Sequence, residues 1–81
     1  MVPANPVPLS LEEHRDLSRE MQRAQARLRE LASLVLGIYG PQSTPGLALA
    51  RLNDVFDKAR QEMRVQAALD CPGQPLDGIY E

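Results

Sequence analysis

Cysteine and aromatic residues are scarce in this chain of 81 residues, which limits how it can stabilise itself. Cys71 is the only cysteine, so an internal disulfide and a cysteine-based zinc site are excluded, and a reducing cytoplasm is favoured. Two tyrosines, one phenylalanine and no tryptophan cannot fill a rounded core. We therefore predict one small domain with a thin core, for which association between copies is the usual remedy.

An excess of charge of either sign is also missing. Nine lysines and arginines face eleven acidic residues, for a net charge of −2. Arginines recur at positions 15, 19, 23 and 27, a spacing that could follow a phosphate backbone. Acidic residues at 12, 16, 20 and 30 lie three positions away from them, as in surface ion pairs of a helix. We therefore expect no nucleic-acid partner.

Long apolar runs are absent, and so are the signs of a targeting segment. Residues 1–9 lack a basic start and an unbroken apolar stretch, so they do not form a signal peptide. Three prolines in six residues predict an extended, proline-rich arm instead. The longest uncharged stretch contains prolines and glycines that would leave unsatisfied backbone in lipid, so no membrane partner is expected.

The first helix has a marked start and a marked end. Ser10 and Glu13 have the spacing of a capping box, and Gly40-Pro41 is a strong stop. The sequence predicts a helix over residues 11–39. Apolar or small positions alternate in steps of three and four, which is typical of a coiled-coil seam: His14, Leu17, Met21, Ala24, Leu28, Leu31, Val35 and Ile38.

A second helix is predicted over residues 45–70, with Thr44 as its N-cap and Pro45 at its first position. The short connection implies that the two helices are antiparallel, so residues 10–71 form a helical hairpin. Residues 72–81 are predicted to be a tail, although Leu76, Ile79 and Tyr80 make it rather apolar. The stripe on the second helix comprises Leu49, Leu52, Val55, Phe56, Ala59, Met63 and Ala67.

The strongest asymmetry is a charge-free tip, residues 31–50, which holds no charged residue in twenty positions. A single hairpin cannot bury it, and each leucine left in water forgoes about 1.5–3 kcal/mol. Such contiguous apolar surfaces usually mark an interface. The expected interface residues are Leu28, Leu31, Leu34, Val35, Leu36, Ile38, Leu47, Leu49, Leu52 and Phe56.

Residue patterns that carry chemistry are missing. His14 is the only histidine and lacks the partners of a bundle metal site, so we interpret it as a boundary residue at the end of the seam. No nucleophile–base pair and no glycine-rich phosphate loop is present. We therefore expect no enzymatic activity, cofactor, metal or small-molecule substrate.

The sequence thus predicts an all-α, non-enzymatic structural or interaction protein in the cytoplasm. Its antiparallel hairpin is expected to self-associate through the charge-free tip, as a homodimer that forms a four-helix bundle. The alternative is an adaptor or accessory subunit that docks the tip, or the segment Leu76–Tyr80, on a different protein.

Overall fold

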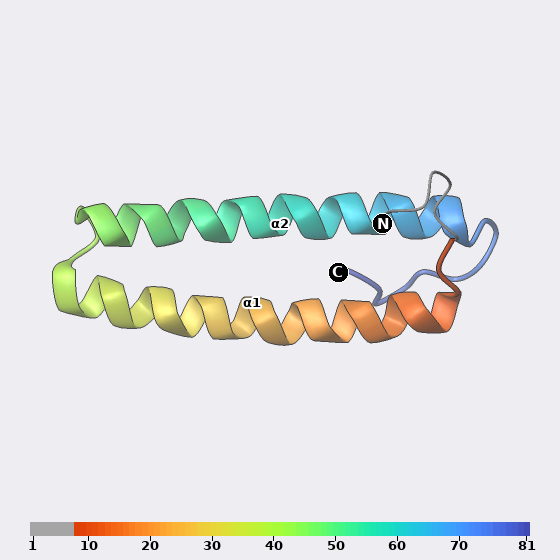
Figure 1. Ribbon diagram of the computed structural model, residues 1–81, viewed down its shortest axis with the longest axis horizontal. Coiled ribbons are helices and arrows are strands. Elements are labelled where there is room, and N and C mark those ends of the chain that lie inside the picture. Colours follow the sequence, from red (N-terminus) through yellow and green to blue (C-terminus); the bar gives the residue numbers. More distant parts are fainter. Residues whose placement is uncertain (1–7) are drawn as a thin grey trace, which may run out of the picture.

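The computed structural model describes residues 8–81 and consists of two long helices packed side by side. Helix α1 spans Leu11–Tyr39 and helix α2 spans Thr44–Asp70, and they run in opposite directions (Figure 1). No strand occurs among these residues. The predicted all-α hairpin is therefore confirmed. Residues 1–7 of the predicted arm lie outside the described residues.

The first helix begins where the sequence predicts it. The Ser10 side chain accepts a hydrogen bond from the Glu13 backbone N–H at 3.1 Å, and the Glu13 carboxylate accepts one from the Ser10 N–H at 3.0 Å. This capping box satisfies two of the free donors at the helix start. At the other end Gly40 takes φ 93°, and its N–H binds the Leu36 carbonyl at 2.9 Å.

The start of α2 differs from the prediction by one residue. Ser43, not Thr44, is the N-cap, because its hydroxyl oxygen accepts from the Gly46 N–H at 3.1 Å. The same hydroxyl donates to the Gly40 carbonyl at 2.6 Å. Ser43 therefore joins the end of α1 to the start of α2, a double role that Thr44, already inside the helix, does not fill.

The face that α1 turns toward α2 is rotated from the predicted seam. His14, Met21, Leu28 and Val35 are buried or half-buried, as predicted. Between them the structure buries or half-buries Ser18, Gln25 and Ala32 instead of Leu17, Ala24 and Leu31. The seam is therefore wrong at every second position, because small or amide side chains, rather than leucines, fill the space between the two helices.

Helix α2 is rotated in the same sense. Gly46, Leu49, Phe56, Met63 and Ala67 are buried or half-buried, whereas Leu52, Val55 and Ala59 of the predicted stripe are exposed. One exposed row therefore runs along each helix. We call these two rows together the open face, which consists of Leu17, Ala24, Leu31 and Ile38 of α1 and Pro45, Leu52, Ala59 and Gln66 of α2.

The tail, residues 71–81, folds back over the open end of the hairpin (Figure 1). Ile79 and Tyr80 are buried with Ala67, and Leu11, Met21, Met63 and Leu76 pack against them. The Tyr80 N–H donates to the Ser18 hydroxyl at 2.8 Å. Tyr80 has φ 58°, a backbone conformation that costs a non-glycine residue about 1 kcal/mol, so its burial must outweigh that cost.

Candidate interaction surface

The two rows of the open face lie on the same side of the hairpin, opposite the tail. The tail runs beside Arg15 and Gln22 of α1, and its Glu81 forms an ion pair with Arg64 of α2 at 2.8 Å. On each helix, a residue beside the tail comes two positions before a residue of the open face. Arg15 precedes Leu17 in this way on α1, and Arg64 precedes Gln66 on α2. Two residues turn a helix by about 200°, so both rows point away from the tail.

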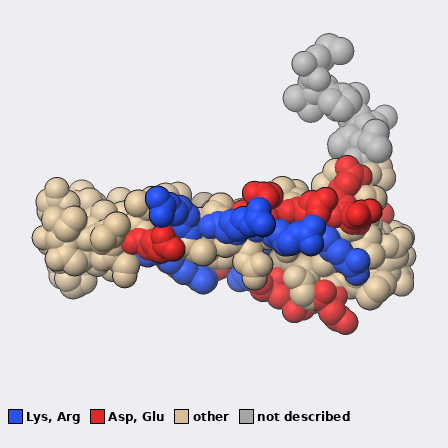
Figure 2. All heavy atoms as spheres, turned by 90° about the horizontal axis from the view of Figure 1, so that it is seen from below, with Lys and Arg blue, Asp and Glu red and all other residues tan. Residues whose placement is uncertain are grey.

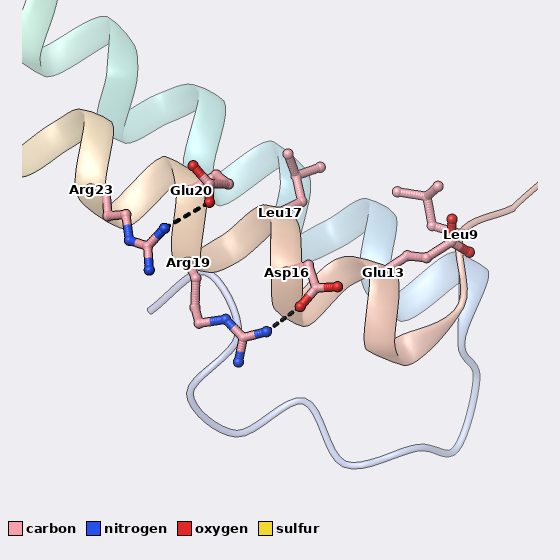
Figure 3. Close-up of a pocket in the computed structure, with 7 residues that line it drawn as sticks. All are labelled: Leu9, Glu13, Asp16, Leu17, Arg19, Glu20 and Arg23. Atoms are coloured by element: carbon pink, nitrogen blue, oxygen red, sulfur yellow. Dashed lines mark hydrogen bonds and ion pairs between the residues drawn. The ribbon is translucent and has the colours of Figure 1, made fainter.

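A close view of the open end agrees with this arrangement. In Figure 3 the Leu17 and Leu9 side chains point to the side away from the tail, whereas Arg19 extends toward the tail ribbon. Leu9 and Leu17 border a shallow hollow on the surface of α1, whose other lining residues are all charged: Glu13, Asp16, Arg19, Glu20 and Arg23. Leu9 therefore extends the apolar row beyond Leu17, but charged side chains flank it at this end of the hairpin.

None of the eight open-face residues carries a charge. The exposed fraction is 44% for Leu31, 48% for Leu52 and 70% for Ile38. The antiparallel register that joins Gln25 to Asp57 places Leu31 level with Leu52, and Ala24 level with Ala59. The hairpin therefore carries an uncharged strip on one side, apolar except at Gln66. Contiguous exposed apolar surfaces of this kind commonly mark an interface.

The charge-free tip is mostly uncovered. Of its residues only Ala32 and Gly46 are buried. In Figure 2 one end of the molecule shows no charged atoms on the face in view, while acidic and basic side chains gather along the middle and toward the other end. Among the predicted interface residues, Leu28, Val35, Leu49 and Phe56 are half-buried between the helices; Leu31, Leu34, Leu36, Ile38, Leu47 and Leu52 are exposed.

The arginines of α1 are paired along its outer surface. Three of the predicted pairs form: Asp16 with Arg19, Glu20 with Arg23 at 2.9 Å, and Arg27 with Glu30 at 3.1 Å. All six side chains are exposed. The row of arginines is therefore accompanied by carboxylates at the same height, which lowers the positive potential that a phosphate backbone would need.

A buried polar cluster at the open end joins both helices to the tail. His14 is fully buried, with Nε2 2.9 Å from an Asp70 carboxylate oxygen and Nδ1 2.9 Å from the Tyr80 hydroxyl. Because a carboxylate only accepts, Nε2 donates to Asp70, and in the neutral ring Nδ1 accepts from Tyr80. Asp70 also accepts from the Gln66 side chain at 2.8 Å and from the Leu9 N–H at 3.3 Å.

This cluster corrects the interpretation of His14 as a boundary residue. The apolar composition of the tail is the one feature of the sequence that points to this cluster. No local pattern connects His14 with Tyr80, which lies 66 positions away. Both ring nitrogens are occupied and no part of the ring reaches solvent. The His14–Tyr80 hydrogen bond therefore fastens the tail, and the His14–Asp70 pair joins the two helices. The ring has no free nitrogen with which to act on a substrate.

The cluster also shifts the acidity of its members. Hydrogen bonds from Gln66 and then from His14 hold the pKa of Asp70 below its ordinary value of 3.8. Burial, with a smaller contribution from the charge of Asp70, raises the pKa of the Tyr80 phenol above 10.0. Both shifts favour the same arrangement at neutral pH, namely an ionised carboxylate and a protonated phenol that can donate to His14.

A second polar contact lies midway along the hairpin. Gln25 is buried and donates to an Asp57 carboxylate oxygen at 2.6 Å, and Arg60 donates to the same oxygen at 3.2 Å. The hydrogen bond from Gln25, followed by the charge of Arg60, lowers the pKa of Asp57. A buried polar contact of this kind fixes the register of paired helices, because sliding either helix would leave it unsatisfied.

Cys71 is buried next to the cluster, where its thiol lies 3.5 Å from the Leu9 carbonyl. Within residues 8–81, no group of three histidine, cysteine or acidic side chains is placed to hold a metal ion. Neither of the two described helices is apolar enough over a sufficient length to cross a membrane. Comparisons with protein-family models, curated proteins and solved structures find no match to this chain.

Proposed function

We propose that this protein is a non-enzymatic interaction module whose hairpin pairs with a second copy of itself to form a four-helix bundle. One observation carries the proposal: the apolar seam of each helix is divided between two surfaces. Half of it, including Leu28 and Phe56, is partly covered within the hairpin, and half of it, including Leu31 and Leu52, lies on the open face.

In a four-helix bundle both halves of such a seam point toward a common centre. Residues of the first half are half-buried because each already touches the other helix and has one side left open. A second hairpin laid on the open face would cover both halves at once. Self-association therefore supplies the core that two thin helices lack, and it is the commonest form of closed oligomer.

The alternative, an adaptor that docks on a different protein, now depends on the tip and the open face alone. The tail segment that the sequence offered as a second docking element has Ile79 and Tyr80 buried in the chain's own core. Presenting that segment to a partner would require the His14 cluster to break. We also propose a reducing, cytoplasmic setting, because the single cysteine has no second cysteine in the chain to pair with.

Sedimentation equilibrium of the wild-type protein tests the proposal, and a dimer is expected. Replacing two open-face leucines, as Leu31→Glu with Leu52→Glu, should convert the dimer to a monomer, because four carboxylates would be buried at the interface. The matched control is Ala26→Glu with Val65→Glu, which adds the same charge to exposed apolar positions outside both the open face and the expected interface. A folded wild-type monomer at every concentration would contradict the proposal and favour the adaptor.

A further inference from the structure

The open face has a pattern of charges along its α1 edge that bears on how two copies meet. Glu20 and Arg27 each lie three positions beyond an open-face residue, Leu17 and Ala24 respectively, so both flank the face on the same edge. On α2, Glu62 occupies the equivalent place beyond Ala59. All three side chains are exposed, and the in-chain partners of Glu20 and Arg27 lie on the outer surface of α1.

From this pattern we infer that the second copy lies antiparallel to the first, with the two connecting loops at opposite ends of the bundle. The inference rests on the proposed self-association and adds its geometry. In this arrangement α1 packs on α1 of the second copy and α2 packs on α2. With Ala24 at the twofold axis, Glu20 of each copy meets Arg27 of the other, so two attractive pairs form.

The competing arrangement joins the two tips. Helix α1 would then pack on α2 of the second copy. The residues that face each other there would be the same ones that lie level between α1 and α2 within one chain. The register seen between Gln25 and Asp57 places Glu20 level with Glu62. Glu20 would therefore meet Glu62 of the second copy twice, and these like charges at a dimer edge oppose that pairing.

The same charges select one antiparallel register. A shift of the two copies by one heptad pairs like charges. In one direction Glu20 faces Glu20 of the second copy, and in the other direction Arg27 faces Arg27 of the second copy. Of these three registers, only the one centred on Ala24 avoids both contacts, and it also overlaps α1 over nearly its whole length. The small side chains of Ala24 and Ala59 then lie at the centre, where they allow the helices to approach closely.

This register also brings the tip of each copy over the open end of the other. Leu31 lies opposite Leu17 of the second copy, and Ile38 lies beyond it, near the hollow bordered by Leu9 and Leu17. The exposed leucines at one end of the hairpin thereby lie beside Leu9 and Leu17 at the other end, in a hollow whose remaining lining is charged. A surface that is complementary to itself in this way fits a second copy of this chain.

Distances between spin labels distinguish the arrangements. A nitroxide at Gln42→Cys in the loop, with Cys71→Ser to remove the other thiol, leaves the open face unchanged. In the antiparallel dimer the two labels should be about 50 Å apart, since about 35 residues of helix separate them at 1.5 Å each. A separation of about 20 Å or less would overturn the antiparallel inference while leaving the dimer in place. A monomer at every concentration would overturn the proposed function as well.

Charge reversal gives a second test with opposite signs for the two arrangements. Glu20→Arg should weaken antiparallel dimerisation about tenfold, because two attractive pairs become repulsive. Combining it with Arg27→Glu should restore the dissociation constant to within about threefold. In the tip-to-tip arrangement Glu20→Arg would instead tighten the dimer. Asp16→Arg is the matched control, because it breaks the equivalent in-chain pair, with Arg19, away from the open face.

Discussion

The Tyr80 hydroxyl lies 2.9 Å from Nδ1 of the fully buried His14, and this hydrogen bond fastens the end of the chain to the start of α1. Removing the hydroxyl in Tyr80→Phe keeps the ring in place but leaves a buried imidazole nitrogen without a donor. We expect a loss of about 1–3 kcal/mol in the free energy of unfolding, measured by urea denaturation. A change below about 0.3 kcal/mol would mean that Nδ1 finds another partner.

The Asp70 carboxylate should make stability depend on acid pH. Because hydrogen bonds lower its pKa in the folded protein, the folded state binds this proton less readily than the unfolded chain does. Its contribution is therefore fully present above the ordinary value of 3.8 and is lost as the pH falls below that value toward the folded pKa. In Asp70→Asn this contribution is absent at all pH values.

Thermal melting of wild type and Asp70→Asn from pH 7 to pH 2 measures this effect. The variant should be less stable at neutral pH, and the difference should shrink as the pH falls. Some acid sensitivity should remain in the variant, because the pKa values of Glu13 and Asp57 are also lowered by hydrogen bonds. Two curves that stay parallel down to pH 2 would show that Asp70 makes no pH-dependent contribution.

Truncation of the tail should destabilise the hairpin more strongly than any single polar change. Removing residues 78–81 deletes Ile79 and Tyr80, each worth about 1.5–3 kcal/mol when fully buried, and exposes His14 and Ala67. We expect a large fall in melting temperature and faster amide hydrogen exchange at the open end. The matched control, Glu81→Gln, removes only a half-exposed ion pair with Arg64 and should cost about 0.5 kcal/mol.

The helices themselves could be predicted from the sequence because their end signals are local. The capping box at Ser10 and the stop at Gly40 depend only on neighbouring residues, and both appear in the structure. Local signals do not fix the N-cap of α2, because Ser43 and Thr44 have the same capping chemistry. What decides between them is the second hydrogen bond of Ser43, to Gly40 across the loop.

The packing face could not be predicted, because hydrophobicity alone does not say which surface a leucine covers. The periodic pattern selects Leu17 and Leu31 over Ser18 and Gln25, yet the hairpin buries the latter pair more deeply. Ser18 is needed to bind the tail, and Gln25 is needed to bind Asp57. Both requirements come from contacts between distant segments, which no local pattern records.

The connecting loop offers a matched pair of glycine substitutions. Gly46 is buried at the start of α2, where a Cβ atom would lie 2.9 Å from the Gly40 carbonyl oxygen and 3.1 Å from a Leu36 methyl group. Gly46→Ala should therefore cost about 1–3 kcal/mol, because the backbone of the turn must move. Gly37→Ala meets no atom within 4 Å and should instead stabilise the protein by up to about 1 kcal/mol, since alanine favours a helix interior. Urea denaturation of the two variants measures both effects, and equal shifts of the same sign would show that the turn does not pack around Gly46.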